Sequence, residues 1–214
     1  MTYLELVNDV LVRLRESTVS TVGETTYSSL IGKFVNDAKR QIEDSFNWNV
    51  LSTTITITTT ANTHSYSLTG AGQKFQLNDA INKTSVIGLT NISFVEMNRK
   101  LNFQTPATSI PSEFVFSGVD SNGDTKVELF PVPDGVYTVI FELNVPQATL
   151  SSDSTTVKVL DYLVTQSAYA RALIERGEDG GTASSEAYAL FKGMLSDAIA
   201  LEGTRYIENN FEPV

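Results

Sequence analysis

The feature that most constrains the fold is a change in hydrophobic period along the chain. Apolar residues recur at helical spacing before residue 50, alternate with polar residues over the next hundred, and return to helical spacing after residue 151. This order of helix, strand and helix blocks predicts an α+β fold. Because neither terminal helix pair can cover its apolar stripe alone, we expect both chain ends to form one four-helix bundle.

The blocks predict a division of the 214 residues into three parts. Residues 1–50 and 151–205 are expected to form the helical bundle domain. Residues 51–150 are expected to form an inserted antiparallel, sandwich-like β domain. Residues 206–214 are too few to fold alone, and we interpret them as a C-terminal docking arm.

Local signals place the helices. Thr2, with Glu5 three residues later, is typical of a capping box, and a helix is expected directly after it. A second amphipathic helix is expected over roughly Thr26–Phe46. In the C-terminal block a helix is expected to end near Arg176, before a glycine-rich connection at Gly177–Gly181 and a fourth helix.

The β block begins with alternation from Leu51 to Thr58, and Ser65–Leu68 is predicted to return beside it as a hairpin. Three later segments are predicted to form a three-stranded meander: Phe114–Phe116, Lys126–Phe130 and Val136–Val145. The last of them is apolar on both faces, which favours a central strand in a sandwich. Residues 70–111 are expected to hold short strands and a helical turn within Val95–Leu101.

Composition excludes several classes of function. The chain has no cysteine and one histidine, His64, which excludes thiolate chemistry and multi-histidine metal sites. The net charge of −10 argues against a protein that holds nucleic acid by neutralising phosphates. No stretch approaches the ~20 apolar residues of a membrane helix, and the N-terminus lacks signal-peptide features, so no membrane partner is expected.

No motif indicates catalysis. His64 is interpreted as a side chain at a strand end, and Asp120–Asp124 as a hairpin turn rather than a calcium loop. Carboxylates on predicted strands, Glu113, Glu128 and Glu142, leave a polysaccharide-cleaving enzyme as an alternative. We nevertheless predict that the protein is not an enzyme and has no catalytic residue, metal site or cofactor.

Several segments carry a resemblance to a known family. They are Met1–Asn8, Phe34–Lys39, Phe46–Trp48, Leu51–Thr59, Phe130–Tyr137 and Tyr169–Glu178. In these segments and in the order of its blocks, the chain resembles the head-to-tail adaptors of short-tailed phages, also called tail tubular protein A or connector proteins. The resemblance implies a helical bundle with an inserted β domain.

The resemblance also implies a structural virion protein, assembled in the host cytoplasm. It implies a homo-oligomeric ring of twelve copies that joins the portal protein to the tail nozzle, with genomic DNA passing through without specific binding. The residues expected to dock on the portal are Arg205, Tyr206, Ile207 and Phe211. A tube or terminator ring subunit elsewhere in the tail is a further alternative.

Overall fold

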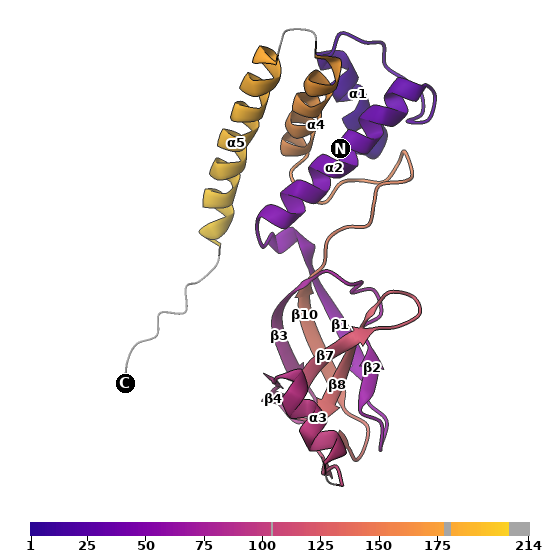
Figure 1. The fold of residues 1–214 in the computed structure, drawn as a ribbon, viewed down its shortest axis with the longest axis vertical. Coiled ribbons are helices and arrows are strands. Elements are labelled where there is room, and N and C mark those ends of the chain that lie inside the picture. Colours follow the sequence, from indigo (N-terminus) through magenta and orange to yellow (C-terminus); the bar gives the residue numbers. More distant parts are fainter. Residues whose placement is uncertain (104, 178–180, 206–214) are drawn as a thin grey trace. The chain divides into compact units, whose positions relative to one another are not determined.

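The structure is a computed structural model that describes residues 1–103, 105–177 and 181–205. The chain divides into two compact units (Figure 1). Met1–Leu51 and the chain from Pro146 onward form the helical unit, and Ser52–Val145 forms the β unit. The fold is therefore mixed α+β, as the change in period predicted.

The helical unit contains α1 (Tyr3–Arg13), α2 (Thr26–Ser45), the short 3-10 helix η1 (Asn49–Leu51), α4 (Asp161–Arg176) and α5 (Thr182–Gly203). The predicted capping box is confirmed, because Thr2 accepts the N–H of Glu5 while the Glu5 carboxylate accepts the N–H of Thr2. Helix α4 ends at Gly177, which adopts the left-handed conformation that glycine takes without a steric penalty.

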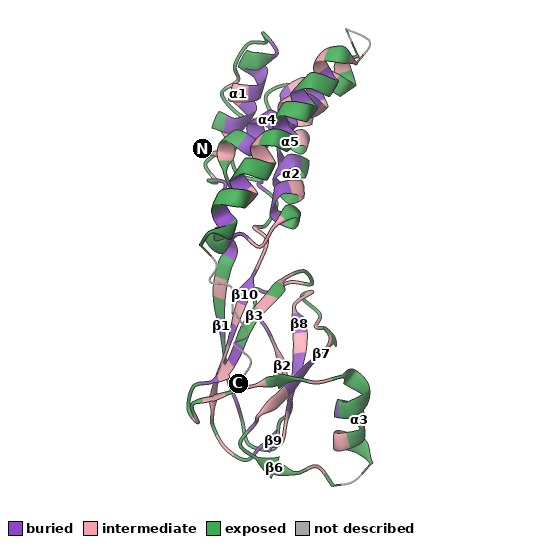
Figure 2. Ribbon diagram, turned by 90° about the vertical axis from the view of Figure 1, so that its left-hand side faces the viewer, coloured by how far each residue is buried: buried purple, intermediate pink, exposed green. Residues whose placement is uncertain are grey.

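One hydrophobic core runs through the helical unit, with buried residues from all four long helices. These faces appear as the purple stripes of the upper helices in Figure 2. The fully buried members include Leu6 and Val10 of α1, Ile31, Val35 and Ile42 of α2, and Leu163, Val164 and Ala168 of α4. Helix α5 contributes Phe191 and Ala198. The two ends of the chain therefore share one core.

The β unit contains two four-stranded sheets. The first has the order β1 (Ser52–Thr58), β10 (Thr138–Asn144), β3 (Gln76–Asn82) and β4 (Ile87–Gly88). The second has the order β2 (Ser65–Ser67), β8 (Thr125–Phe130), β7 (Glu113–Val119) and β5 (Thr90–Asn91). A third pairing joins β6 (Thr108–Ser109) to β9 (Val132–Pro133), and α3 covers Phe94–Asn102.

Both four-stranded sheets contribute to one hydrophobic core in the β unit. Phe114 of β7 and Phe141 of β10 are fully buried, with ring centroids 5.3 Å apart in an edge-to-face arrangement. Phe116 packs edge-to-face on Phe114 and on Phe75. Since β7 and β10 belong to different sheets, these contacts join the sheets face to face.

The predicted strand pairings are partly wrong. Strand β2 does not return beside β1 but pairs with β8 in the other sheet. The meander also fails, because β7 pairs with β8 while β10 lies between β1 and β3. Pro131 directly follows β8 and offers no N–H for its ladder, so the chain leaves the second sheet there, passes through β9 and then joins the first sheet as β10.

Other expectations for the β unit are confirmed. The strand that is apolar on both faces, β10, is central in its sheet. The long pairings are antiparallel, although β5 with β7 and β6 with β9 are parallel over two residues each. The helical turn expected within Val95–Leu101 is the two-turn helix α3, capped by Ser93.

Candidate functional site

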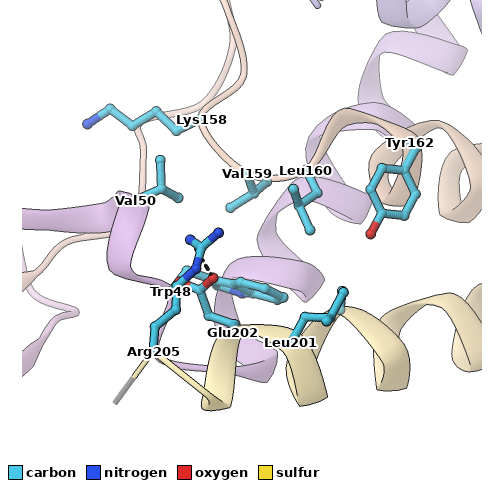
Figure 3. Close-up of a pocket in the computed structure, with 10 residues that line it drawn as sticks. Trp48, Val50, Lys158, Val159, Leu160, Tyr162, Leu201, Glu202 and Arg205 are labelled. Carbon is cyan, nitrogen blue, oxygen red and sulfur yellow. Dashed lines mark ion pairs between the residues drawn. The ribbon is translucent and has the colours of Figure 1, made fainter. Parts of the chain in front are cut away.

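A pocket of about 320 Å³ lies in the helical unit at the C-terminal end of α5 (Figure 3). We call it the α5-end pocket. It is lined by residues that follow α2, residues that precede or begin α4, and the end of α5: Trp48, Val50, Lys158, Val159, Leu160, Tyr162, Ala198, Leu201, Glu202 and Arg205. Three segments distant in sequence therefore build one site.

Trp48 forms the floor of the α5-end pocket. Its side chain is buried, and its indole N–H donates to the carbonyl of Ile42 at 2.7 Å, which holds the ring against the end of α2. The Phe46 ring meets it edge-to-face with centroids 5.6 Å apart. A fixed aromatic floor of this kind presents a preformed apolar surface to whatever enters.

Glu202 joins α5 to the other side of the pocket. One carboxylate oxygen accepts the backbone N–H of Asn49 at 3.0 Å, and the other pairs with the Arg205 guanidinium at 3.0 Å. Arg205 itself is mostly exposed, with 68% of its side chain accessible. The ion pair of Figure 3 therefore orients Arg205 over the pocket and leaves its other donors toward solvent.

The pocket mouth is unusually apolar for a surface. Leu201 is 71% exposed, and Val50, Leu160 and Tyr162 are also exposed. Lys158 also lines the pocket, and in Figure 3 its side chain runs past Val50 and carries the ammonium away from the hollow. An apolar hollow with the Arg205 guanidinium at its edge suits an apolar or aromatic side chain.

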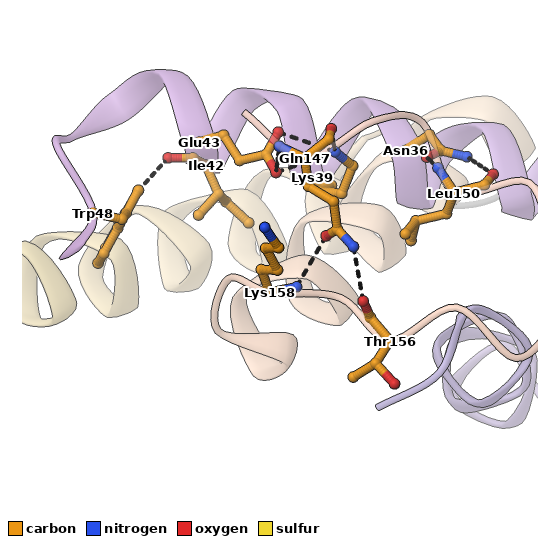
Figure 4. Close-up of polar contacts among 9 residues, drawn as sticks. All are labelled: Asn36, Lys39, Ile42, Glu43, Trp48, Gln147, Leu150, Thr156 and Lys158. Atoms are coloured by element: carbon orange, nitrogen blue, oxygen red, sulfur yellow. Dashed lines mark hydrogen bonds and ion pairs between the residues drawn. The ribbon is translucent and has the colours of Figure 1, made fainter. Parts of the chain in front are cut away.

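The wall that carries Lys158 belongs to residues 146–160, which we call the strap. A buried ion pair on α2 fastens its beginning (Figure 4): Lys39 binds both carboxylate oxygens of Glu43 at 3.0 and 3.1 Å. The Lys39 ammonium also donates to the carbonyl of Gln147 at 2.6 Å, and the Gln147 N–H donates to Glu43. Burial raises the pKa of Glu43 above the usual glutamate range despite these partners.

The Gln147 side chain then bridges to the far part of the strap. Its amide nitrogen donates to the Thr156 carbonyl at 2.8 Å, and its amide oxygen accepts the Lys158 N–H at 3.0 Å. Asn36 of α2 makes a similar two-way bond with the N–H and C=O of Leu150. Apart from one antiparallel bridge between Thr156 and Thr2, the strap has no strand pairing, so these side chains bond several of its backbone groups and fix the pocket wall.

Of the residues predicted to dock, the structure brings Arg205 to the α5-end pocket. Tyr206, Ile207 and Phe211 lie outside the described residues. No sequence pattern indicates Trp48, Lys158 or Leu201 as site residues, because these residues are far apart along the chain and only the fold brings them to one pocket. The exposed positions of Leu160 and Leu201, at the ends of otherwise amphipathic segments, are the nearest thing to such a signal.

The residues considered for catalysis lie in the β unit. His64 immediately precedes β2 and is half-buried. Glu113 pairs with Lys100 at 2.6 Å, while Glu142 belongs to the other sheet and accepts the Thr54 hydroxyl. Within the described residues, no three or more His, Asp or Glu side chains form a group that could hold a metal ion.

The Asp120 side chain stabilises the turn between β7 and β8 by accepting backbone N–H groups within it. Its carboxylate accepts the backbone N–H groups of Asn122 and Asp124 at 2.8 and 3.0 Å. These bonds lower the pKa of the Asp120 carboxyl, and the bond from Asp124 has the largest effect.

Across the parts of the chain that the structure covers, no helix has the length and apolar character needed to cross a membrane.

Comparison with known proteins agrees with the resemblance in the sequence. The model of one protein family, described as SU10 adaptor protein, matches residues 1–210. No functionally curated protein matches the chain significantly. Because the match spans both units and almost every residue, the chain belongs to the SU10 adaptor protein family, a family of phage head-to-tail adaptors, and is a structural virion protein.

Proposed function

We propose that this adaptor forms a ring of twelve copies that joins the portal protein to the tail nozzle and continues the DNA channel. The family match over residues 1–210 carries the proposal. The protein acts as a binding and spacing element without an active site of its own. It assembles in the host cytoplasm and remains in the virion between head and tail.

The helical unit is the part that we assign to the portal. Here α1, α2, α4 and α5 act as a four-helix bundle, supported by their common core. The α5-end pocket, with Arg205 in its lining, and the residues Tyr206, Ile207 and Phe211 beyond it form the contact. The pocket supports this role because exposed apolar side chains around a fixed aromatic floor are typical of protein interfaces.

The β unit, residues 52–145, is the part that we assign to the contacts within the ring and to the nozzle.

The charge of the whole chain bears on the DNA channel. A charge of −10 on each copy gives a ring of twelve roughly −120 in total. A negative wall repels DNA, so the duplex slides through during packaging and ejection without being held. This view agrees with the absence of specific DNA binding expected from the sequence.

A substitution at the pocket mouth tests the portal contact. Leu201→Glu places a carboxylate beside the apolar floor, and we expect at least a tenfold loss of binding to portal-bearing heads in a cosedimentation assay. Leu201 is 71% exposed, so the melting temperature of the free subunit should not change. Leu190→Glu is the matched control, since Leu190 is 58% exposed on the same helix and does not line the pocket.

Removal of residues 206–214 tests the C-terminal arm separately. We expect a soluble subunit with an unchanged melting temperature and strongly weakened attachment to heads, because the arm carries three apolar anchors. If the truncation lowers the melting temperature and head binding survives, the arm packs on its own helical unit. Full binding by Leu201→Glu would remove the pocket from the portal contact.

A further inference from the structure

We infer that the outer edge of β1 is a self-association surface at which a strand of a second copy extends the first sheet of the β unit. The inference deepens the proposed function, since a ring needs contacts between copies. It rests on the geometry of one strand, Ser52–Thr58.

The pairing of β1 leaves half of its backbone groups facing away from the sheet. Strand β1 is the outermost strand in the order β1-β10-β3-β4. The Thr59 N–H donates to the Tyr137 carbonyl at 2.9 Å, which sets the alternation of the ladder. Ile55 and Ile57 therefore bond to β10, while the N–H and C=O of Thr54 and Thr56 point outward.

This edge lacks the devices by which proteins protect a sheet from further pairing. Such devices are short length, charge, proline and bulges. Strand β1 has seven residues without a charge or a proline, and its register with β10 has no shift. The edge strands β4, β2 and β5 have only two, three and two residues. Among the described strands, β1 is thus the long edge that is open to pairing.

The chemistry of the edge favours a second copy as the occupant. Each copy carries −10, so two copies repel wherever their surfaces bear carboxylates. Residues 52–58 are an uncharged, threonine-rich run, and β-branched residues are good strand formers. One carboxylate lies beside this run: Glu142 of β10, the strand partner of Thr54, accepts the Thr54 hydroxyl.

The proposed ring also determines how two copies pair. Two β1 edges that meet each other close a two-fold dimer, whereas a ring needs head-to-tail contacts between different surfaces. The opposite edge of the same sheet offers a different surface, because the short strand β4 covers only Ile81 and Asn82 of β3, and among the described strands none pairs with the rest of the β3 edge. The first sheet of one copy then continues into that of the next.

One backbone substitution tests the edge. Thr56→Pro removes an N–H that points away from β10, so the internal ladder keeps its bonds while the outer one is blocked. We expect the adaptor concentration at which half of the adaptor sites on portal-bearing heads are occupied to rise at least tenfold. We also expect the binding curve to lose its cooperativity. Thr56→Val is the matched control, because it keeps the N–H and the β-branched shape.

Further measurements keep the test decisive. If Thr56→Pro does not fold, the double variant Thr54→Lys/Thr56→Lys places two charged side chains on the edge strand, one of the devices by which natural sheets prevent further pairing, and circular dichroism verifies its fold. Sedimentation of the free protein at rising concentration tests self-association without portal. The inference is overturned if a folded edge variant associates like the wild type, if only dimers form, or if rings form normally and only nozzle attachment is lost.

When the wild type binds no heads but still associates in sedimentation, the portal proposal fails while the edge inference stands. When the wild type fills heads and Thr56→Pro does so with the same cooperativity, the edge inference fails while the portal proposal stands. A wild type that associates in neither assay overturns the edge inference.

Discussion

The two units of this adaptor satisfy their backbones in different ways. In the β unit, the strands bond to one another, and the core between the sheets is built from phenylalanine and aliphatic side chains. In the helical unit, backbone groups within each helix bond along that helix, but the strap at residues 146–160 is irregular apart from one bridge between Thr156 and Thr2. Asn36, Lys39 and Glu43 therefore serve the strap as side-chain partners. Polar residues are buried where the backbone has no regular structure to bond to.

Phe141→Ala should give the largest effect and should act on the β unit alone. Phe141 is fully buried on the central strand and contacts Phe114 of the other sheet. We expect a loss of about 3–5 kcal/mol in the unfolding free energy of that unit. Denaturant titration followed by near-UV circular dichroism measures it, and separate transitions for the two units are expected.

Phe103→Ala is the control for that experiment, since Phe103 is 81% exposed in the same unit. It should shift the β-unit transition by less than about 0.5 kcal/mol. Equal losses in both variants would mean that the core between the sheets does not hold the β unit together.

Lys39→Met should destabilise the helical unit by about 3 kcal/mol, because it leaves the buried Glu43 carboxylate without its cation. The loss is at the low end of the usual range because Glu43 can take up a proton, as its raised pKa indicates. The double variant Lys39→Met/Glu43→Leu should recover most of the stability, since it removes both charges. A double variant less stable than Lys39→Met would show that Glu43 holds the strap without Lys39.

Glu43→Gln should produce the smallest effect, visible as a change with pH. A folded-state pKa raised above the unfolded value means that the folded protein holds the proton more tightly. The contribution of Glu43 is therefore greatest below the ordinary glutamate pKa and is lost as the pH rises through the raised value. The stability of the wild type relative to Glu43→Gln should fall across that window in thermal melts. A difference that is constant with pH contradicts the raised pKa.

The sequence predicted the helices well because their signals are local. The capping box at Thr2 and Glu5 and the glycine at residue 177 mark helix ends within a few residues. Strand partners could not be predicted in the same way. Alternation shows that residues 65–67 and 138–144 are strands, but it does not show which sheet each strand joins. The expectation that strands adjacent in sequence pair with each other assigned both to the wrong sheet.

Of the residues that line the α5-end pocket, the sequence analysis singled out one, Arg205, and its docking on the portal stays a prediction. Arg205 was predicted from its place at the start of an apolar arm, and it lines the α5-end pocket. Trp48 and Lys158 belong to other segments, and only the fold of the strap against α2 brings them to Arg205. Because the pocket is built from three segments that are far apart in the sequence, no hydrophobic period or motif spacing indicates it.

The shared core of the two chain ends has a consequence for biosynthesis. The β unit is one continuous segment, so it can close its core while the ribosome is still making the residues that follow it. Helices α1 and α2 must wait, because their core partners in α4 and α5 are translated last. Once the β unit has folded, Ser52 lies opposite Asn144, about 5 Å away for strand partners. The folded β unit therefore brings the end of α2 close to the start of the segment that leads to α4. The entropy cost of closing this long loop has been met before the helices pack together.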